Sequence, residues 1–155
     1  MFLANARSVK GKTAELTAMT KDYDIICITE THLDPNINSN CVIETPGLYF
    51  FRCDRNSHGG GVLIATKHSL QANKPDIDTL SEEMVIVELP PDTILCCYYR
   101  PHVSQQNISV INSILSSILH KYPNHKLILL GDMNFPGIDW NAGLVRPGTQ
   151  YKSIQ

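Results

Sequence analysis

The pattern of apolar and polar positions along the chain predicts a series of short strands. Each run is largely apolar and ends in polar or turn-forming residues, which is typical of strands in a layered domain. These runs lie at residues 2–5, 24–31, 84–89, 93–101 and 127–130, and the segment 48–66 predicts two further strands joined by a turn over residues 56–60. The run at 24–31 is almost continuously apolar, which predicts a strand covered on both faces.

Two segments instead repeat their apolar residues at helical spacing. A helix is predicted over about 10–21, and an amphipathic helix over about 104–121, where isoleucines and leucines recur every three or four residues until Pro123 ends the pattern. Residues after Trp140 show little periodicity. Strands mixed with two helices predict an α/β or α+β layered domain, and 155 residues fit a single one.

Composition and charge narrow the functional classes. No run approaches the roughly 18 apolar residues of a membrane span, and the first residues lack the apolar core of a signal peptide, so we expect an intracellular protein without a membrane partner. The formal net charge of −2 excludes a polybasic nucleic-acid wrapper. Any contact with DNA must be local, through cations such as Arg52, Arg55, Lys67 and Arg100, each of which could equally be solvated surface.

The cysteines and histidines do not predict a zinc site. The five cysteines show no CxxC spacing, and the adjacent pair Cys96 and Cys97 would point to opposite faces of one strand. The six histidines are scattered along the chain. We therefore expect reduced, partly buried thiols.

Three of the predicted strands end in oxygen-bearing side chains of one chemical kind. The strand at 2–5 ends in Asn5, the next in Glu30, and the strand at 127–130 runs into Asp132 and Asn134. If these strands lie side by side in one orientation, their tips meet at one edge of the sheet, where open α/β sheets bind ligands. Carboxylate and amide oxygens suit Mg²⁺ or Mn²⁺. The pattern favours metal-assisted hydrolysis of a phosphoester.

The strand that ends at residue 101 adds a phenol and a guanidinium, because Tyr99 and Arg100 stand at its tip. Both groups can hold a phosphate, and Arg100 is therefore a candidate substrate-binding residue.

Two other interpretations of these residues compete with a metal site. Asp, Asn and Glu at strand ends often form turns or cap helices, although Pro136 and Gly137 leave the segment after Asn134 without a helix to cap. The stretch FLANARSVKGKTAEL also has the order of a phosphate-binding loop. Its first glycine is replaced by Ala6, which removes the backbone freedom that cradles phosphates.

Five short motifs in order resemble one family. NARS, YDIICITETHLD, DRNSHGGGVLIA, YYRP and LLGDMNFPGIDW are similar to motifs of the endonuclease/exonuclease/phosphatase family, from about residue 2 to 141. They look most like the DNase I-like endonuclease domain that precedes reverse transcriptase in non-LTR retrotransposons of the jockey and CR1 kind. The resemblance implies a four-layered sandwich, in which two mostly antiparallel sheets are flanked by helices and the strand tips meet at one end of both sheets.

The resemblance also implies roles for individual residues. Glu30 and Asn5 would hold Mg²⁺ or Mn²⁺, and Asp132 would orient or deprotonate the attacking water. Asn134 and Tyr99 would hold the phosphate and its developing charge. All five are expected to be catalytic residues. DNA is the expected partner once the carboxy-terminal part of the domain completes the chain, and the nucleus is the expected location of an intact element.

One departure from the family affects activity. The family ends in a serine-aspartate-histidine motif that this sequence does not contain, so residues 1–155 are expected to form a partial domain that lacks the last third of the sandwich. The functional hypothesis is the amino-terminal portion of a DNA-nicking endonuclease. A catalytically inactive fragment or binding module, and a phosphatase of small phosphoesters, stay open as alternatives.

Overall fold

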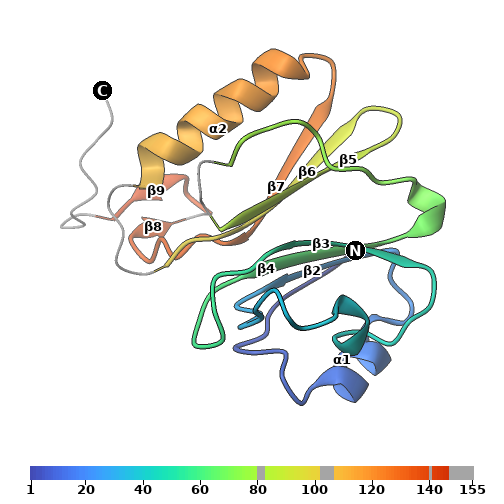
Figure 1. Cartoon of the computed structure of the whole chain (residues 1–155). Helices are drawn as coiled ribbons and strands as arrows, with labels where there is room; N and C mark the ends of the chain where they lie inside the picture. The colour runs from blue at the N-terminus through green and yellow to red at the C-terminus, as the bar shows by residue number, and fades with distance from the viewer. Residues whose placement is uncertain (80–82, 102–106, 140, 147–155) are drawn as a thin grey trace.

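The chain forms two β-sheets packed face to face, with one helix outside each sheet (Figure 1). The computed structural model describes residues 1–79, 83–101, 107–139 and 141–146. Within these residues, no helix is long and apolar enough to cross a membrane. Residues 104–106 of the predicted second helix and Trp140 of the GIDW motif lie outside the described residues.

The first sheet carries the amino-terminal strands in the order β1-β2-β4-β3. β1 is parallel to β2, whereas β4 is antiparallel to both of its neighbours. The bounds are β1 Phe2–Asn5, β2 Ile25–Thr29, β3 Leu48–Cys53 and β4 Val62–Lys67. The helix α1, Thr13–Thr20, and the short 3₁₀ helix Ser39–Cys41 lie on the outer side of this sheet (Figure 1).

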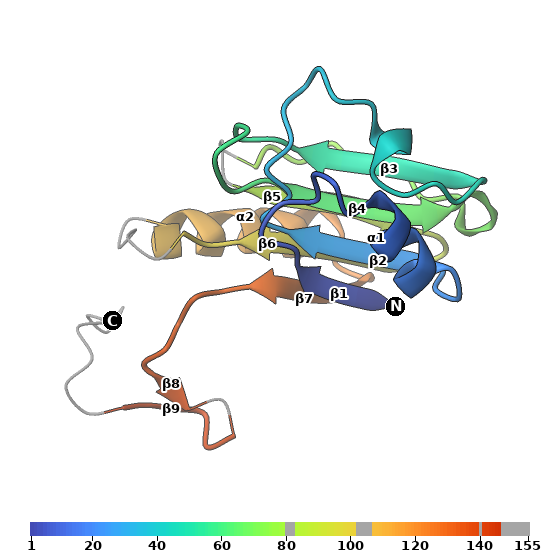
Figure 2. The ribbon, with the colours of Figure 1, turned by 90° about the horizontal axis from the view of Figure 1, so that it is seen from below.

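The second sheet has the order β5-β6-β7, with β5 antiparallel and β7 parallel to β6. The bounds are β5 Met84–Leu89, β6 Thr93–Tyr99 and β7 Lys126–Asp132. The helix α2, Asn107–Lys121, covers the outer face. A 3₁₀ helix, His68–Leu70, follows β4, and a small hairpin, β8 Ile138–Asp139 and β9 Leu144–Val145, extends away from the sandwich (Figure 2).

Successive side chains along the central strands point to opposite faces of each sheet, and together they build three layers of apolar core. On β2, Ile26 and Ile28 pack toward α1, while Cys27 between them packs between the sheets. On β6, Cys96 packs toward α2 and Cys97 between the sheets, as the sequence predicts. All five thiols are free, and burial raises the pKa of Cys96 to about 12, so this thiol stays protonated at neutral pH.

The structure confirms the layered fold and corrects one sequence-based assumption. The strand tips do not belong to one sheet, because β1 and β2 are parallel neighbours in the first sheet while β7 lies in the second. β1 and β7 are the edge strands on the same side of the two sheets and lie next to each other across the sandwich (Figure 2). Their tips therefore meet between the sheets.

Gly131 explains why a glycine precedes the acid in GDMN. It pairs with Tyr98 in the β6–β7 register at a φ of +132°. A Cβ atom there would lie 1.9 Å from the carbonyl oxygen of Tyr98. Only glycine lets β7 stay against β6 up to its last residue, which places Asp132 beside Tyr99.

We expect Gly131→Ala to lower the free energy of unfolding by about 2–5 kcal/mol. Overpacking contributes about 1–3 kcal/mol of this loss, and an unfavourable positive φ contributes about 1–2 kcal/mol. Urea denaturation followed by circular dichroism measures this loss. Gly11→Ala is the control, because Gly11 also has a positive φ but no atom within 4 Å of the added methyl group. It should lose only the conformational part, and equal losses in the two variants would contradict the proposed role of close packing.

Candidate active site

The ends of β1, β2 and β7 bring three predicted site residues into direct contact. The amide nitrogen Nδ2 of Asn5 donates to Glu30 Oε1 at 2.7 Å and to Asp132 Oδ2 at 2.9 Å. Asn5 pairs with Thr29 in the parallel β1–β2 register, so Glu30 follows directly beyond its neighbour. One neutral amide thus bridges two carboxylates that belong to different sheets.

The backbone after β2 turns sharply to present Glu30. Glu30 and His32 both have a φ of +53°, which non-glycine residues rarely adopt. Hydrogen bonds on both sides hold this conformation, because Ser8 N donates to the carbonyl of Glu30 and Thr31 N to the carbonyl of Gly61. His32 Nε2 lies 3.9 Å from the other Glu30 oxygen, Oε2. Such conformations cluster at functional sites, and this one directs a carboxylate to the end of the sandwich.

Tyr99 lies beside Glu30 at the end of β6 and is 7 % exposed. Burial and the neighbouring Glu30 carboxylate raise the pKa of Tyr99 to about 12, with Glu83 adding to the rise. The phenol therefore keeps its proton at neutral pH. It can donate a hydrogen bond to a carboxylate or to a phosphate oxygen.

Asn134 and Arg100 hold the loop that follows β7. Asn134 Nδ2 donates to the carbonyl of Arg100 at 2.5 Å, and Arg100 Nη1 donates back to the carbonyl of Asn134 at 3.0 Å. The Arg100 guanidinium also stacks over Phe135 at 4.4 Å from the ring centre. Arg100 is only 3 % exposed, so its described contacts serve the loop, and its substrate-binding role stays a prediction.

Asn134 remains close to Asp132 although its side chain points to Arg100. Its backbone N–H donates to Asp132 Oδ1 at 3.2 Å, at a φ of +46°. One Asp132 oxygen is thus fixed by Asn134 and the other by Asn5. The carboxylate has little freedom to rotate.

The donor set is that of a hard cation. Within the described residues, no three His, Cys, Asp or Glu side chains converge as a metal cluster. Glu30 and Asp132 offer two carboxylates, and Mg²⁺ commonly binds through one or two carboxylates while keeping several waters. The residues present therefore fit Mg²⁺ better than zinc, which needs three or four protein ligands.

Sequence reasoning missed one residue of this region. Glu83, immediately before β5, has a largely covered side chain beside the site and accepts a hydrogen bond from Arg55, which the sequence marks only as one of several possible DNA contacts. Its neighbours along the chain form no motif, so the sequence alone offered no signal for it.

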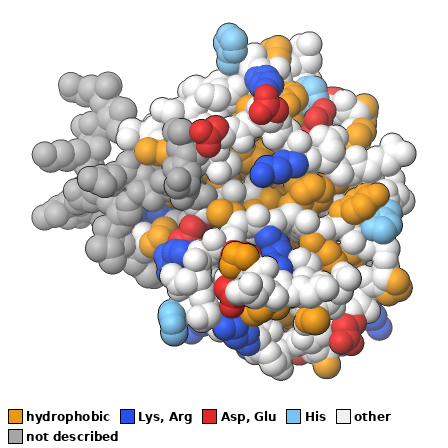
Figure 3. Space-filling model, in the orientation of Figure 1, with side chains coloured by type: hydrophobic (Ala, Val, Ile, Leu, Met, Phe, Trp, Pro, Cys, Tyr) orange, Lys and Arg blue, Asp and Glu red, His pale blue; other side chains and the backbone are white. Residues whose placement is uncertain are grey.

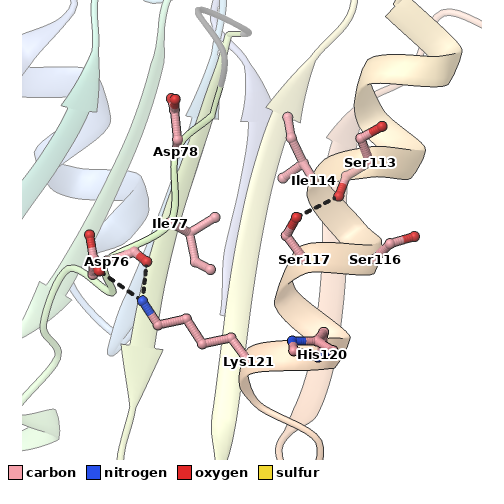
Figure 4. A pocket seen from close by; sticks show the side chains of 9 residues that line it. All are labelled: Asp76, Ile77, Asp78, Ser113, Ile114, Ser116, Ser117, His120 and Lys121. Carbon is pink, nitrogen blue, oxygen red and sulfur yellow. Dashed lines mark hydrogen bonds and ion pairs between the residues drawn. The ribbon is translucent and has the colours of Figure 1, made fainter.

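A cavity of about 600 Å³ lies elsewhere, between α2 and the segment 76–78 (Figure 4). Several of its polar groups bond to one another or to the backbone, since Lys121 pairs with Asp76, and the Ser117 hydroxyl donates to the carbonyl of Ser113. Asp76 and Asp78 both line this cavity, but Asp76 is paired with Lys121. Glu30 and Asp132 are instead bridged by the amide of Asn5.

A two-sheet sandwich with carboxylates, an amide and a phenol gathered at one end is the architecture of the DNase I-like nucleases and phosphatases. The chain belongs to the endonuclease/exonuclease/phosphatase family, whose family model matches residues 1–150. No curated protein matches the sequence.

Solved structures show the same fold. The chain is similar to the 3′-5′ exonuclease NExo from Neisseria meningitidis, with 15 % identity and a TM-score of 0.68 over 89 % of this chain and 58 % of that one. It is also similar to the endonuclease domain of TRAS1, a telomere-specific non-LTR retrotransposon, with 22 % identity and a TM-score of 0.59 over 85 % and 57 %. An AP endonuclease from Archaeoglobus fulgidus is also similar, with 16 % identity and a TM-score of 0.58 over 89 % of this chain and 58 % of that one. The chain thus spans less than two thirds of the length of these structures.

We expect Asn5→Ala to lower the free energy of unfolding by about 1–3 kcal/mol, because it leaves two adjacent carboxylates without their shared donor. Thermal and urea denaturation at low ionic strength measure the loss, which should shrink when Mg²⁺ is added. Asn112→Ala, at an exposed position of α2, is the control and should stay within about 0.5 kcal/mol of wild type. A loss for Asn5→Ala no larger than this would contradict the bridging role.

Proposed function

We propose that this chain is the amino-terminal portion of a metal-dependent phosphodiester hydrolase, a DNA-nicking endonuclease of the non-LTR retrotransposon kind. The observation that carries the proposal is the contact of Asn5 with both Glu30 and Asp132 where the two sheets meet. The similarity to the TRAS1 endonuclease domain supports the retroelement assignment. DNA would be the substrate, and the nucleus the location of the intact element.

The side chains at the site suggest a division of roles. Glu30, with Asn5 beside it, would hold Mg²⁺ or Mn²⁺, which would neutralise phosphate charge and help to activate a water. Asp132, fixed by Asn5 and Asn134, would orient the attacking water and accept its proton. Tyr99, kept as a phenol at neutral pH, would donate to a phosphate oxygen as negative charge develops there, together with Asn134.

The outer edges of β1 and β7 lie beside the candidate site, so what covers these edges affects activity. Among the described residues, no strand pairs with the outer edges of β1 and β7, which carry Asn5 and Asp132 at their tips. Leu3 on β1 is 46 % exposed and Leu129 on β7 is 38 % exposed, and both border an apolar groove. Further strands of the full domain would cover these edges and border the site directly.

Two other functions remain candidates. The NExo structures include one described as a 3′ phosphatase bound to a product DNA hairpin, which favours a phosphatase as the second candidate within the same fold. An inactive fragment or binding module is the third, since the sequence contains no serine-aspartate-histidine motif.

The metal assignment predicts weak binding of Mg²⁺ or Mn²⁺ near Glu30, because few protein ligands are present and the cation keeps its waters. Water-proton relaxation with Mn²⁺ should show binding to the wild-type chain and at least a tenfold weaker affinity for Glu30→Gln. Glu15→Gln, on the exposed side of α1, is the matched control. Equal Mn²⁺ affinity in wild type and Glu30→Gln would exclude the assignment.

The activity prediction compares the 155-residue chain with a version extended by the downstream reading frame through a serine-aspartate-histidine motif. We expect the short chain to nick supercoiled plasmid no faster than its Asp132→Ala variant. The missing histidine would stabilise developing charge, and removal of one such group commonly costs on the order of 10²–10³ in rate. The extended version should nick in a Mg²⁺-dependent way.

Controls for this assay use the extended protein. Asp132→Ala should abolish nicking there, while Asp22→Ala, an exposed acid before β2, should leave it unchanged. Robust nicking by the 155-residue chain that Asp132→Ala abolishes would show that the missing part is dispensable. A loss of nicking in both extended variants would argue against a specific role for Asp132.

A further inference from the structure

A second charged cluster, built from Arg55, Glu83 and the loop between β3 and β4, lies beside Tyr99. Glu83 Oε1 accepts from Arg55 Nη1 at 2.8 Å, and Glu83 Oε2 accepts from the backbone N–H of Gly61 at 2.5 Å. The Glu83 side chain is only 11 % exposed. A buried carboxylate is stable only with such partners, and this one has no role in the mechanism above.

Glycines allow this carboxylate to pack against the backbone. Gly60 and Gly61 have φ values of +68° and +86°. A Cβ on Gly60 would lie 2.2 Å from Glu83 Oε2, and one on Gly61 would lie 2.4 Å from Thr31 Oγ1. The triple glycine of the sequence therefore serves a close approach of the loop to Glu83 and to the turn after β2.

Backbone hydrogen bonds join the cluster to the active site. The carbonyls of Gly60 and Gly61 accept from His32 N and Thr31 N, directly after Glu30. The carbonyl of Glu83 accepts from Tyr99 N at 2.9 Å. Glu83 thus borders both the residue that would hold the metal and the phenol that would contact phosphate.

Arg55 differs from the other cations named as local DNA contacts. Arg52 is engaged by Asp54 and by backbone carbonyls, Lys67 pairs with Asp24 next to the start of β2, and Arg100 is buried. The Arg55 side chain is 41 % exposed at the active-site end. On the face drawn in Figure 3, acidic and basic side chains are interspersed, and the formal net charge of the chain is −2. A single well-placed cation therefore matters more for DNA binding than an extended positive field.

The geometry of the guanidinium leaves one side available. Nη1 is held by Glu83, and Nε donates to the carbonyl of Gly59 at 3.1 Å. Among the described residues, no acceptor contacts Nη2. A planar guanidinium that is held at two of its three nitrogens presents the third, Nη2, in a defined direction, where it can donate to a phosphate oxygen.

We propose that Arg55 binds a backbone phosphate of DNA beside the Glu30–Tyr99 site, and that Glu83 is a positioning residue that orients Arg55 and holds the glycine loop. The proposal deepens the proposed function and rests on it, because the phosphate is that of the DNA substrate. Glu83 acts through Arg55 and through Gly61, without touching the substrate.

The test measures binding of a fluorescein-labelled 20-base-pair duplex by anisotropy between 50 and 200 mM NaCl at constant Mg²⁺. One phosphate contact contributes about 0.9 to the slope of log K against log [salt]. Arg55→Ala should reduce the magnitude of the slope by about 0.9 and weaken binding about eightfold at 100 mM NaCl. Arg55→Lys should keep the slope because it keeps the charge. Lys21→Ala, at the exposed carboxyl end of α1, is the control and should bind as wild type.

The positioning role has its own readout in hydrogen exchange. Glu83→Ala should raise exchange at the Gly61 amide at least tenfold while the amides of α2 keep wild-type protection, which shows that the fold persists. Unchanged exchange at Gly61 would overturn the role of Glu83.

The outcomes separate this proposal from the proposed function. Duplex binding with the same slope in wild type and Arg55→Ala would overturn the Arg55 proposal while leaving the hydrolase assignment in place. A second combination is duplex binding through Arg55 while Mn²⁺ does not bind at Glu30 and the extended protein does not nick DNA. That combination would overturn the hydrolase assignment and leave Arg55 as a DNA contact. Failure of the wild-type chain to bind the duplex at 50 mM NaCl would overturn the Arg55 proposal, while the nicking assay with the extended protein would still decide the hydrolase assignment.

Discussion

A single side-chain amide joins the two sheets at the end where their strands stop. Asn5 Nδ2 donates to a carboxylate of its own sheet, Glu30, and to one of the opposite sheet, Asp132. Two carboxylates at such short range repel each other unless a donor or a cation lies between them. The site geometry therefore depends on Asn5 as a neutral spacer, and the apolar core between the sheets fixes the distance across which it reaches.

The surroundings of this bridge use backbone conformations that most residues avoid. Glu30, His32 and Asn134 have positive φ values, and Gly131 makes an approach that no Cβ would permit. Each occurs within two residues of a bridged carboxylate. Strain of this kind persists because the packed sheets and their hydrogen bonds determine the backbone on both sides. The conformational strain is therefore concentrated in the backbone beside Glu30 and Asp132, whose side chains both contact Asn5.

Much of the fold could be predicted from the sequence because periodicity reports which faces are buried. The strands at 2–5, 84–89 and 93–99 and the helix α2 follow directly from their patterns. Periodicity does not report which strands are neighbours, so the residues alone suggested one parallel sheet. The family resemblance implied two sheets with their strand tips at one end, and the structure places β7 in the second. Glu83 and the hairpin of β8 and β9 were missed, since their roles depend on contacts between distant segments.

The contact between Asn5 and Asp132 spans 127 residues, which sets the order in which the structure can assemble. All strands of the first sheet lie within residues 2–67, so that sheet and its core against α1 can form while the ribosome is still translating the second. Loop closure over so long a stretch is slow compared with local pairing. The contact between Asn5 and Asp132 can consequently form only after β7 has been synthesised, long after the strands of the first sheet.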